Sequence, residues 1–95
     1  MLRLYVVGDR VVGSEYSEDG SSWRELTPTV PVASRAIALI RRLGLSFARL
    51  TFGRGPDWVE CVDVQAFPVW KEISVAFRVS VVTELARWLV RSRTP

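Results

Sequence analysis

The chain has 95 residues, a hydrophobic content of 48% and a net charge of +3. This length predicts one domain over residues 1–95, and the apolar content excludes a disordered chain. The sequence contains no His, which excludes Ser–His and Cys–His catalysis and argues against a zinc site. No apolar run reaches the roughly 20 residues that cross a bilayer, and residues 1–10 lack the apolar core of a signal peptide, so we expect a cytoplasmic protein without membrane contact.

The basic residues are almost all arginine, and they are scattered along the chain. Scattered charge predicts a solvated surface, so a small basic nucleic-acid-binding protein is only an alternative function, and we expect no nucleic-acid partner. The sequence has no Asn, and Gln65 is its one side-chain amide. Avoidance of labile amides is typical of thermophile proteins, so we expect a thermophile origin. The alternative is that genome base composition accounts for the arginine-rich sequence.

Two β-rich runs open the chain, at Leu2–Val7 and Val11–Tyr16. The residues between them, Gly8–Arg10, predict a hairpin turn. Ser17–Ser22 is a polar segment with a central glycine, which indicates a second turn. We expect a third short strand of the same sheet at Trp23–Thr27.

A helix is expected from Val32 to Leu43, with Pro31 in its first turn. Its apolar residues recur at intervals of three and four and form one stripe, namely Ala33, Ala36, Ile37, Ile40 and Leu43. Gly44 occupies the position of a C-terminal glycine cap.

Two further strands are expected at Ser46–Phe52 and Trp58–Gln65, joined by a Gly/Pro turn at Gly53–Asp57. The lone Cys61 lies in the second of these strands. Without a His to activate it, we interpret Cys61 as a small core residue and not as a nucleophile.

The last third of the chain predicts a short helical turn around Val69–Ile73 and a final helix at Val81–Arg91 that Ser80 caps. The expected inner stripe of this helix consists of Val82, Leu85, Ala86 and Leu89. The order of elements predicts an α+β fold, a mostly antiparallel four- to five-stranded sheet with two main helices on one face.

Asp63 and Gln65 are two residues apart on one expected strand, so their side chains point to the same face. A carboxylate and an amide oxygen in this arrangement are ligands for a hard cation such as Mg²⁺. The alternative is that both are ordinary polar residues at a strand end, with Asp63 bonded to the following turn.

Four stretches, in order, resemble the second half of an ATP-grasp domain. They are LRLYVVGDRVVG at residues 2–13, SSWRELT at 21–27, SFARLT at 46–51 and CVDVQAFPVW at 61–70. The branch that they resemble is the carboxylate–amine ligases, such as ribosomal-protein glutamate ligases and lysine-biosynthesis ligases. The resemblance implies the fold of an ATP-grasp C-terminal subdomain, in a degenerate and truncated form.

In that family ATP and Mg²⁺ activate a carboxylate, and the metal is held by an Asp, a Glu and an Asn. The resemblance puts Thr51 in the Asp position, Asp63 in the Glu position and Gln65 in the Asn position, so all three ligands are changed. It implies a vestigial magnesium site at Asp63 and Gln65. It also implies vestigial phosphate contacts at Arg3 and Arg24, and no catalytic residue.

We therefore expect a stand-alone, degenerate ATP-grasp-like half domain that is not active alone and serves as a binding or assembly module. The expected partner is a second copy, in a homodimer, or a polypeptide that carries the missing half. The alternative is the small subunit of a split ATP-dependent carboxylate–amine ligase, to which Arg3, Arg24, Asp63 and Gln65 would contribute. No cofactor is expected for the chain alone; Mg²⁺ and ATP enter only if a partner supplies the other subdomain.

Overall fold

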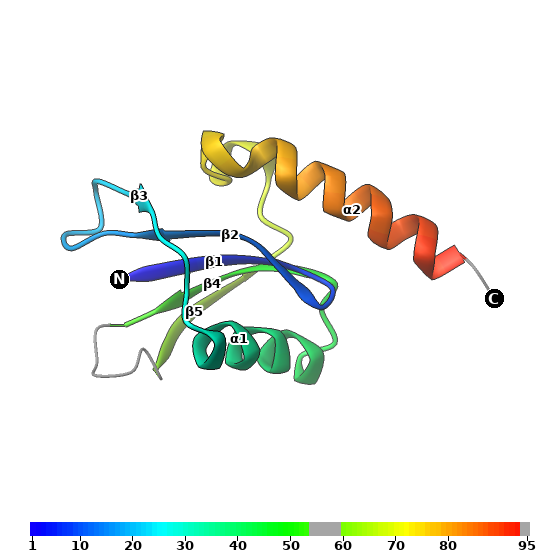
Figure 1. The fold of residues 1–95 in the computed structure, drawn as a ribbon, viewed down its shortest axis with the longest axis horizontal. Helices are drawn as coiled ribbons and strands as arrows, with labels where there is room; N and C mark the ends of the chain where they lie inside the picture. The colour runs from blue at the N-terminus through cyan, green and yellow to red at the C-terminus, as the bar shows by residue number, and fades with distance from the viewer. Residues whose placement is uncertain (54–59, 94–95) are drawn as a thin grey trace.

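Five antiparallel strands form one sheet in the order β3-β2-β1-β4-β5, with a helix on each side of it (Figure 1). The computed structural model of the protein describes residues 1–53 and 60–93. The expected α+β class and the antiparallel sheet are confirmed. Most of the expected turn at Gly53–Asp57, and the start of the strand expected at Trp58, lie outside the described residues.

The central strand β1 (Leu2–Val7) pairs with β2 (Arg10–Tyr16) in the predicted hairpin. Val7 pairs with Arg10, so Gly8 and Asp9 form a two-residue turn. Gly8 has a φ of +59°, the positive value that a type II′ turn requires at its first central position. The third predicted strand is present as the short edge strand β3 (Arg24–Glu25).

Helix α1 (Val30–Arg42) has a proline in its first turn, and the predicted glycine, Gly44, directly follows its C-cap residue Leu43. Gly44 has a φ of +71°, and its N–H donates to the carbonyl of Arg41 at 3.1 Å. The N–H of Leu45 donates to the carbonyl of Ile40 at 2.9 Å, which completes a Schellman cap.

The strands β4 (Phe47–Phe52) and β5 (Cys61–Ala66) pair next to β1. Thr51 faces Asp63, and Phe52 faces Cys61, so Val62 is an extra residue in β5. Such a β-bulge reverses the alternation locally, and it puts Cys61 and Asp63 on opposite faces of the sheet. Burial raises the pKa of the Cys61 thiol, which fits the interpretation of this residue as structural.

After β5 the chain crosses the sheet through two 3₁₀ turns, η1 (Trp70–Glu72) and η2 (Val75–Phe77), before helix α2 (Arg78–Arg93). The helical turn predicted near Val69–Ile73 is confirmed as η1. The predicted cap at Ser80 is wrong, because α2 already begins at Arg78. Among the described residues, no helix is long and apolar enough to span a membrane.

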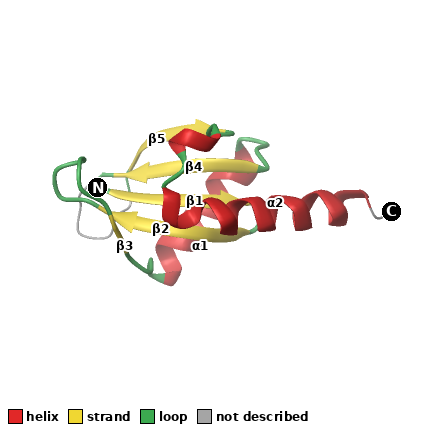
Figure 2. Ribbon diagram, turned by 90° about the horizontal axis from the view of Figure 1, so that it is seen from above, coloured by secondary structure: helices red, strands yellow, loops and turns green. Residues whose placement is uncertain are grey.

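The two helices lie on opposite faces of the sheet, so the expectation that they share a face is wrong (Figures 1 and 2). The reason lies in β1, where Leu4 and Val6 pack toward α1 while Tyr5 and Val7 pack toward α2. A central strand with apolar side chains on both faces requires a cover on each.

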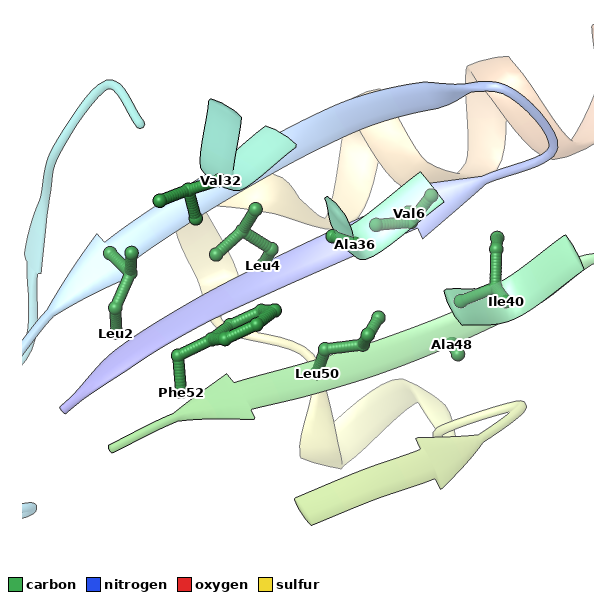
Figure 3. Packing of buried hydrophobic residues seen from close by; sticks show 9 residues of the cluster. All are labelled: Leu2, Leu4, Val6, Val32, Ala36, Ile40, Ala48, Leu50 and Phe52. Carbon is green, nitrogen blue, oxygen red and sulfur yellow. The ribbon is translucent and has the colours of Figure 1, made fainter. Parts of the chain in front are cut away.

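The core on the α1 face is a cluster of nine apolar side chains (Figure 3), namely Leu2, Leu4, Val6, Val32, Ala36, Ile40, Ala48, Leu50 and Phe52. The cluster on the other face consists of Tyr5, Val7, Phe47, Ile73, Phe77 and Val81. Leu43, which we expected on the inner stripe of α1, is exposed.

The predicted inner stripe of α2 is correct at Leu85 and wrong at Val82, Ala86 and Leu89. Val81 is buried, and Leu85 and Trp88 pack against the sheet, whereas Val82 and Leu89 are exposed. The buried Phe77 anchors the chain immediately before α2, so the face that continues from Phe77 through Val81 becomes the inner one.

Candidate functional site

A row of polar side chains crosses four strands on the face of the sheet that α2 partly covers. Arg3 is the cross-strand partner of both Glu15 and Thr51, and Thr51 is the partner of Asp63. Cross-strand partners point to the same face, so Glu15, Arg3, Thr51 and Asp63 form one line, here called the polar row. The structure thus brings three of the sequence-predicted positions together: Arg3, Thr51 and Asp63.

Gln65 lies on the same face, in the next line of partners, opposite Arg49. The 3₁₀ turn η1 lies over this line and supplies Glu72. The amide nitrogen of Gln65 donates to the carboxylate oxygen Oε2 of Glu72, and the backbone N–H of Val69 donates to Oε1 at 2.9 Å. Arg49 donates to the backbone carbonyl of Glu72, also at 2.9 Å. Gln65 therefore fastens η1 to β5.

Hydrogen bonds shift the titration of Glu72. The backbone N–H of Val69, and then the Gln65 amide, lower the pKa of the Glu72 carboxyl below its ordinary value. Both donors stabilise the ionised carboxylate, so the contact between Gln65 and Glu72 is strongest when Glu72 is charged.

Glu15 is the buried centre of a second network on this face, with an exposed fraction of 3%. Its Oε1 accepts hydrogen bonds from the Ser74 hydroxyl at 2.7 Å and from the Tyr5 hydroxyl at 3.4 Å. The backbone N–H of Ser74 in turn donates to the Tyr5 hydroxyl at 3.1 Å. This network ties the segment before α2 to the sheet.

Arg3 is held from two sides. Its Nη1 lies 3.5 Å from Glu15 Oε1, and its guanidinium carbon lies 3.8 Å from the centre of the Trp23 ring. Stacking on an aromatic face and pairing with a carboxylate are both favourable for a guanidinium. Arg3, which we predicted as a phosphate contact, therefore already interacts with Glu15 and Trp23 of its own chain.

Arg24 is not part of this arrangement. It pairs with Tyr16 across β2 and β3, and its guanidinium carbon lies 5.9 Å from the Tyr16 ring. Tyr16 packs against the cluster on the α1 face, so Arg24 lies on the opposite face from Arg3. The structure does not bring the two predicted phosphate contacts together.

The residues at the three ligand positions do not fit a magnesium ion. Mg²⁺ requires near-octahedral oxygen ligands at about 2.0–2.1 Å and favours carboxylates. Thr51 supplies only a neutral hydroxyl on a residue with 8% exposure, and the Gln65 amide is bonded to Glu72. Both carboxylate oxygens of the neighbouring Glu72 already accept internal hydrogen bonds. Of the two carboxylates, Glu72 and Asp63, only Asp63 is left without such a bond. Over residues 1–53 and 60–93, no group of three or more Asp, Glu, Cys or His side chains is arranged to hold a metal.

Sequence reasoning missed Glu15 and Glu72, the two carboxylates that organise this face. Glu15 occupies an inward position of the predicted strand Val11–Tyr16, and a charged residue there signals a buried partner. Glu72 follows Val69 by three residues, a spacing at which a carboxylate reaches back to the backbone N–H that begins a helical turn.

Among solved structures, the chain is similar to an ATP-grasp ligase, PsnB, complexed with a minimal precursor. The TM-score is 0.63 at 13% sequence identity, and the match covers 97% of this chain. The chain has an ATP-grasp-like fold. It spans only 36% of the ligase chain, so it corresponds to part of such an enzyme. No protein-family model and no curated protein matches the sequence.

Proposed function

We propose that the chain is a degenerate ATP-grasp-like half domain, of carboxylate–amine ligase ancestry, that works as a non-catalytic binding or assembly module. In this proposal Asp63 and Gln65 are the remnants of a magnesium site, and Arg3 and Arg24 are the remnants of phosphate contacts. The partner is a second copy or a polypeptide that carries the other subdomain. Mg²⁺ and ATP have no role in the chain by itself.

The contact between Gln65 and Glu72 carries this proposal. In the position where related ligases hold a metal, this chain uses its amide to fasten a turn onto β5. Thr51, in the position of the third ligand, contributes no charge. Side chains committed to internal hydrogen bonds are costly to recruit for a ligand, because each would leave a partner unsatisfied.

The test is isothermal titration of the isolated protein with Mg²⁺–ATP. We expect no saturable heat. An intact ATP-grasp ligase with both subdomains, titrated under the same conditions, is the positive control. Saturable binding of Mg²⁺–ATP by this chain would contradict the proposal.

A split ATP-dependent ligase is the second candidate, and the polar row favours it. Arg3, Thr51 and Asp63 remain aligned on one face, and phosphoryl transfer depends mainly on positioned charges. With Arg24 on the opposite face, this candidate rests on Arg3, Asp63 and Gln65.

Its test is to combine the chain with a separate polypeptide that carries an ATP-grasp N-terminal half and to measure Mg²⁺-dependent ATP consumption with candidate carboxylates. Consumption that Asp63→Ala abolishes would establish this candidate in place of the binding module. Consumption at the rate of the N-terminal half alone would exclude it.

A further inference from the structure

Helix α2 carries two apolar stripes, and only one of them packs against the sheet. The inner stripe follows Val81, Leu85 and Trp88. The second, here called the outer stripe, consists of Val79, Val82, Ala86 and Leu89. Its spacing of three, four and three residues is that of the apolar seam in paired helices.

The outer stripe is exposed. Val79 is 77% exposed and Leu89 is 62% exposed, values far above those of the inner stripe. The C-terminal part of α2 extends beyond the strands, so the sheet does not cover it (Figures 1 and 2). A row of apolar side chains on the outside of a helix is a common mark of an interaction surface.

The charges around the outer stripe are positive. Arg78, Arg87 and Arg91 lie on α2, and its one acidic residue, Glu84, is 8% exposed. The Glu84 carboxylate is already paired with Arg87 at 2.8 Å and with Arg10 at 3.3 Å. A groove of about 450 Å³ beside Ala86 of the stripe is lined by Arg10, Arg87 and Arg91, with Glu84 as the one acidic residue of its lining.

This charge pattern selects the partner. A second copy of α2 would bring arginines against arginines, and like charges across an interface cost affinity. A lipid surface would complement the charge, but it imposes no heptad-like spacing on the apolar residues. A partner helix with its own apolar seam and acidic flanks satisfies both the spacing and the charge.

We infer that the outer stripe of α2 docks an amphipathic helix with acidic flanks from a partner polypeptide. The inference rests on the proposed binding role and identifies its surface. The partner's apolar seam packs along Val79, Val82 and Leu89, and its carboxylates reach Arg78 on one side of the seam and Arg87 on the other. The small side chain of Ala86 allows the two helices to approach closely at this point.

The probe is a synthetic three-heptad peptide with leucine at the seam and glutamate at the flanking positions, fluorescently labelled and measured by anisotropy. The matched peptide carries lysine in place of every glutamate. We expect saturable binding of the glutamate peptide that weakens as salt rises, and binding of the lysine peptide at least about tenfold weaker. Equal binding of the two peptides, or no binding of either, would overturn the inference.

The matched protein variants separate this surface from any other. The double variant Val82→Asp/Leu89→Asp should bind the glutamate peptide at least about 30-fold more weakly than the wild type, as expected for two residues central to an interface. Val30→Asp, at a 78% exposed position on α1, is the control and should leave binding unchanged. Circular dichroism checks that each variant is folded. Loss of binding in the control, or none in the double variant, contradicts the inference.

Two further measurements identify other occupants. A dimer in sedimentation velocity that the double variant dissociates would assign the stripe to a second copy. Flotation with phosphatidylglycerol vesicles, lost in the same variant, would assign it to a lipid surface. Either result overturns the helix partner. If the peptide does not bind and Mg²⁺–ATP gives no saturable heat, only the inference about this surface is excluded. If Mg²⁺–ATP binds, the proposed function itself is excluded.

Discussion

The two faces of the sheet were built from the same strands and differ sharply in composition. Toward α1, every member of the buried cluster is apolar. Toward α2, apolar side chains such as Val7 and Phe47 occupy one end, and the polar row occupies the other. Buried polar groups are usually hydrogen-bonded, and here the fold itself supplies partners for Nη1 of Arg3, for Glu15 and for Gln65. This face of the sheet is thus engaged largely by groups of its own chain.

The largest effect is expected from the apolar face. Leu50 is fully buried against α1, so Leu50→Ala removes contacts that the neighbours cannot replace. We expect a loss of about 3 kcal/mol in the free energy of unfolding, measured by urea denaturation. Val30→Ala, at a 78% exposed position, is the control and should change stability by less than about 0.5 kcal/mol. A loss below about 1 kcal/mol for Leu50→Ala would contradict the assignment of the core.

A smaller effect tests how closely the second face is packed. A Cβ added at Gly13 would lie 2.6 Å from Cγ of Phe77, and the φ of Gly13 does not itself require glycine. Gly13→Ala should therefore destabilise the protein by about 1–3 kcal/mol through overpacking. Phe77→Leu makes room for the added methyl group. The double variant should therefore lose less stability than the sum of the losses of the two single variants. Strict additivity in the same urea experiment would show that the two residues do not touch.

The link between η1 and β5 should depend on pH. The pKa of Glu72 is lowered in the folded state from an ordinary value of 4.5, so its charged form contributes stability above that value. The contribution is lost as pH falls through the lowered folded-state pKa. Glu72→Gln should therefore be less stable than the wild type at neutral pH and equal to it in strong acid, in a series of thermal melts. Asp63→Asn, at a residue for which the structure shows no hydrogen bond to η1, is the control variant. A stability difference between Glu72→Gln and the wild type that stays constant at all pH values would contradict the prediction.

The smallest effect is expected at Asp19, in the turn between β2 and β3. Asp19 accepts hydrogen bonds from the backbone N–H groups of Ser21 and Ser22, which lower the pKa of its carboxyl. Asp19→Ala should reduce the melting temperature slightly at neutral pH, with Glu18→Ala as the neighbouring control. If Glu18→Ala costs as much, the turn depends on charge in general and not on these bonds.

The sequence predicted the elements that one pattern alone determines. The β1–β2 hairpin and the capped end of α1 follow from Gly8 and Gly44, whose positive φ values few other residues adopt. The ATP-grasp-like fold was likewise predicted from the order of motifs. These features depend on local chemistry, so neighbouring residues are enough to indicate them.

Features that depend on which elements meet were not predicted. In α2, Val81 and Val82 begin two equally apolar stripes, and only packing against the sheet decides which is buried. In the candidate site, the spacing of Asp63 and Gln65 correctly indicated a shared face. The contact of Gln65 with Glu72 could not be read from spacing, because it arises where the chain turns back over β5. The roles of Arg3, Arg24, Asp63 and Gln65, the homodimer and the thermophile origin stay predictions.

The central claim is that this chain acts through the outer stripe of α2 and not through the polar row. The most direct test records backbone amide NMR spectra of ¹⁵N-labelled protein with Mg²⁺–ATP and then with the glutamate peptide. The account predicts no shifts at Arg3, Thr51 or Asp63 with Mg²⁺–ATP, and saturable shifts at Val82 and Leu89 with the peptide. Saturable shifts along the polar row with Mg²⁺–ATP would contradict it.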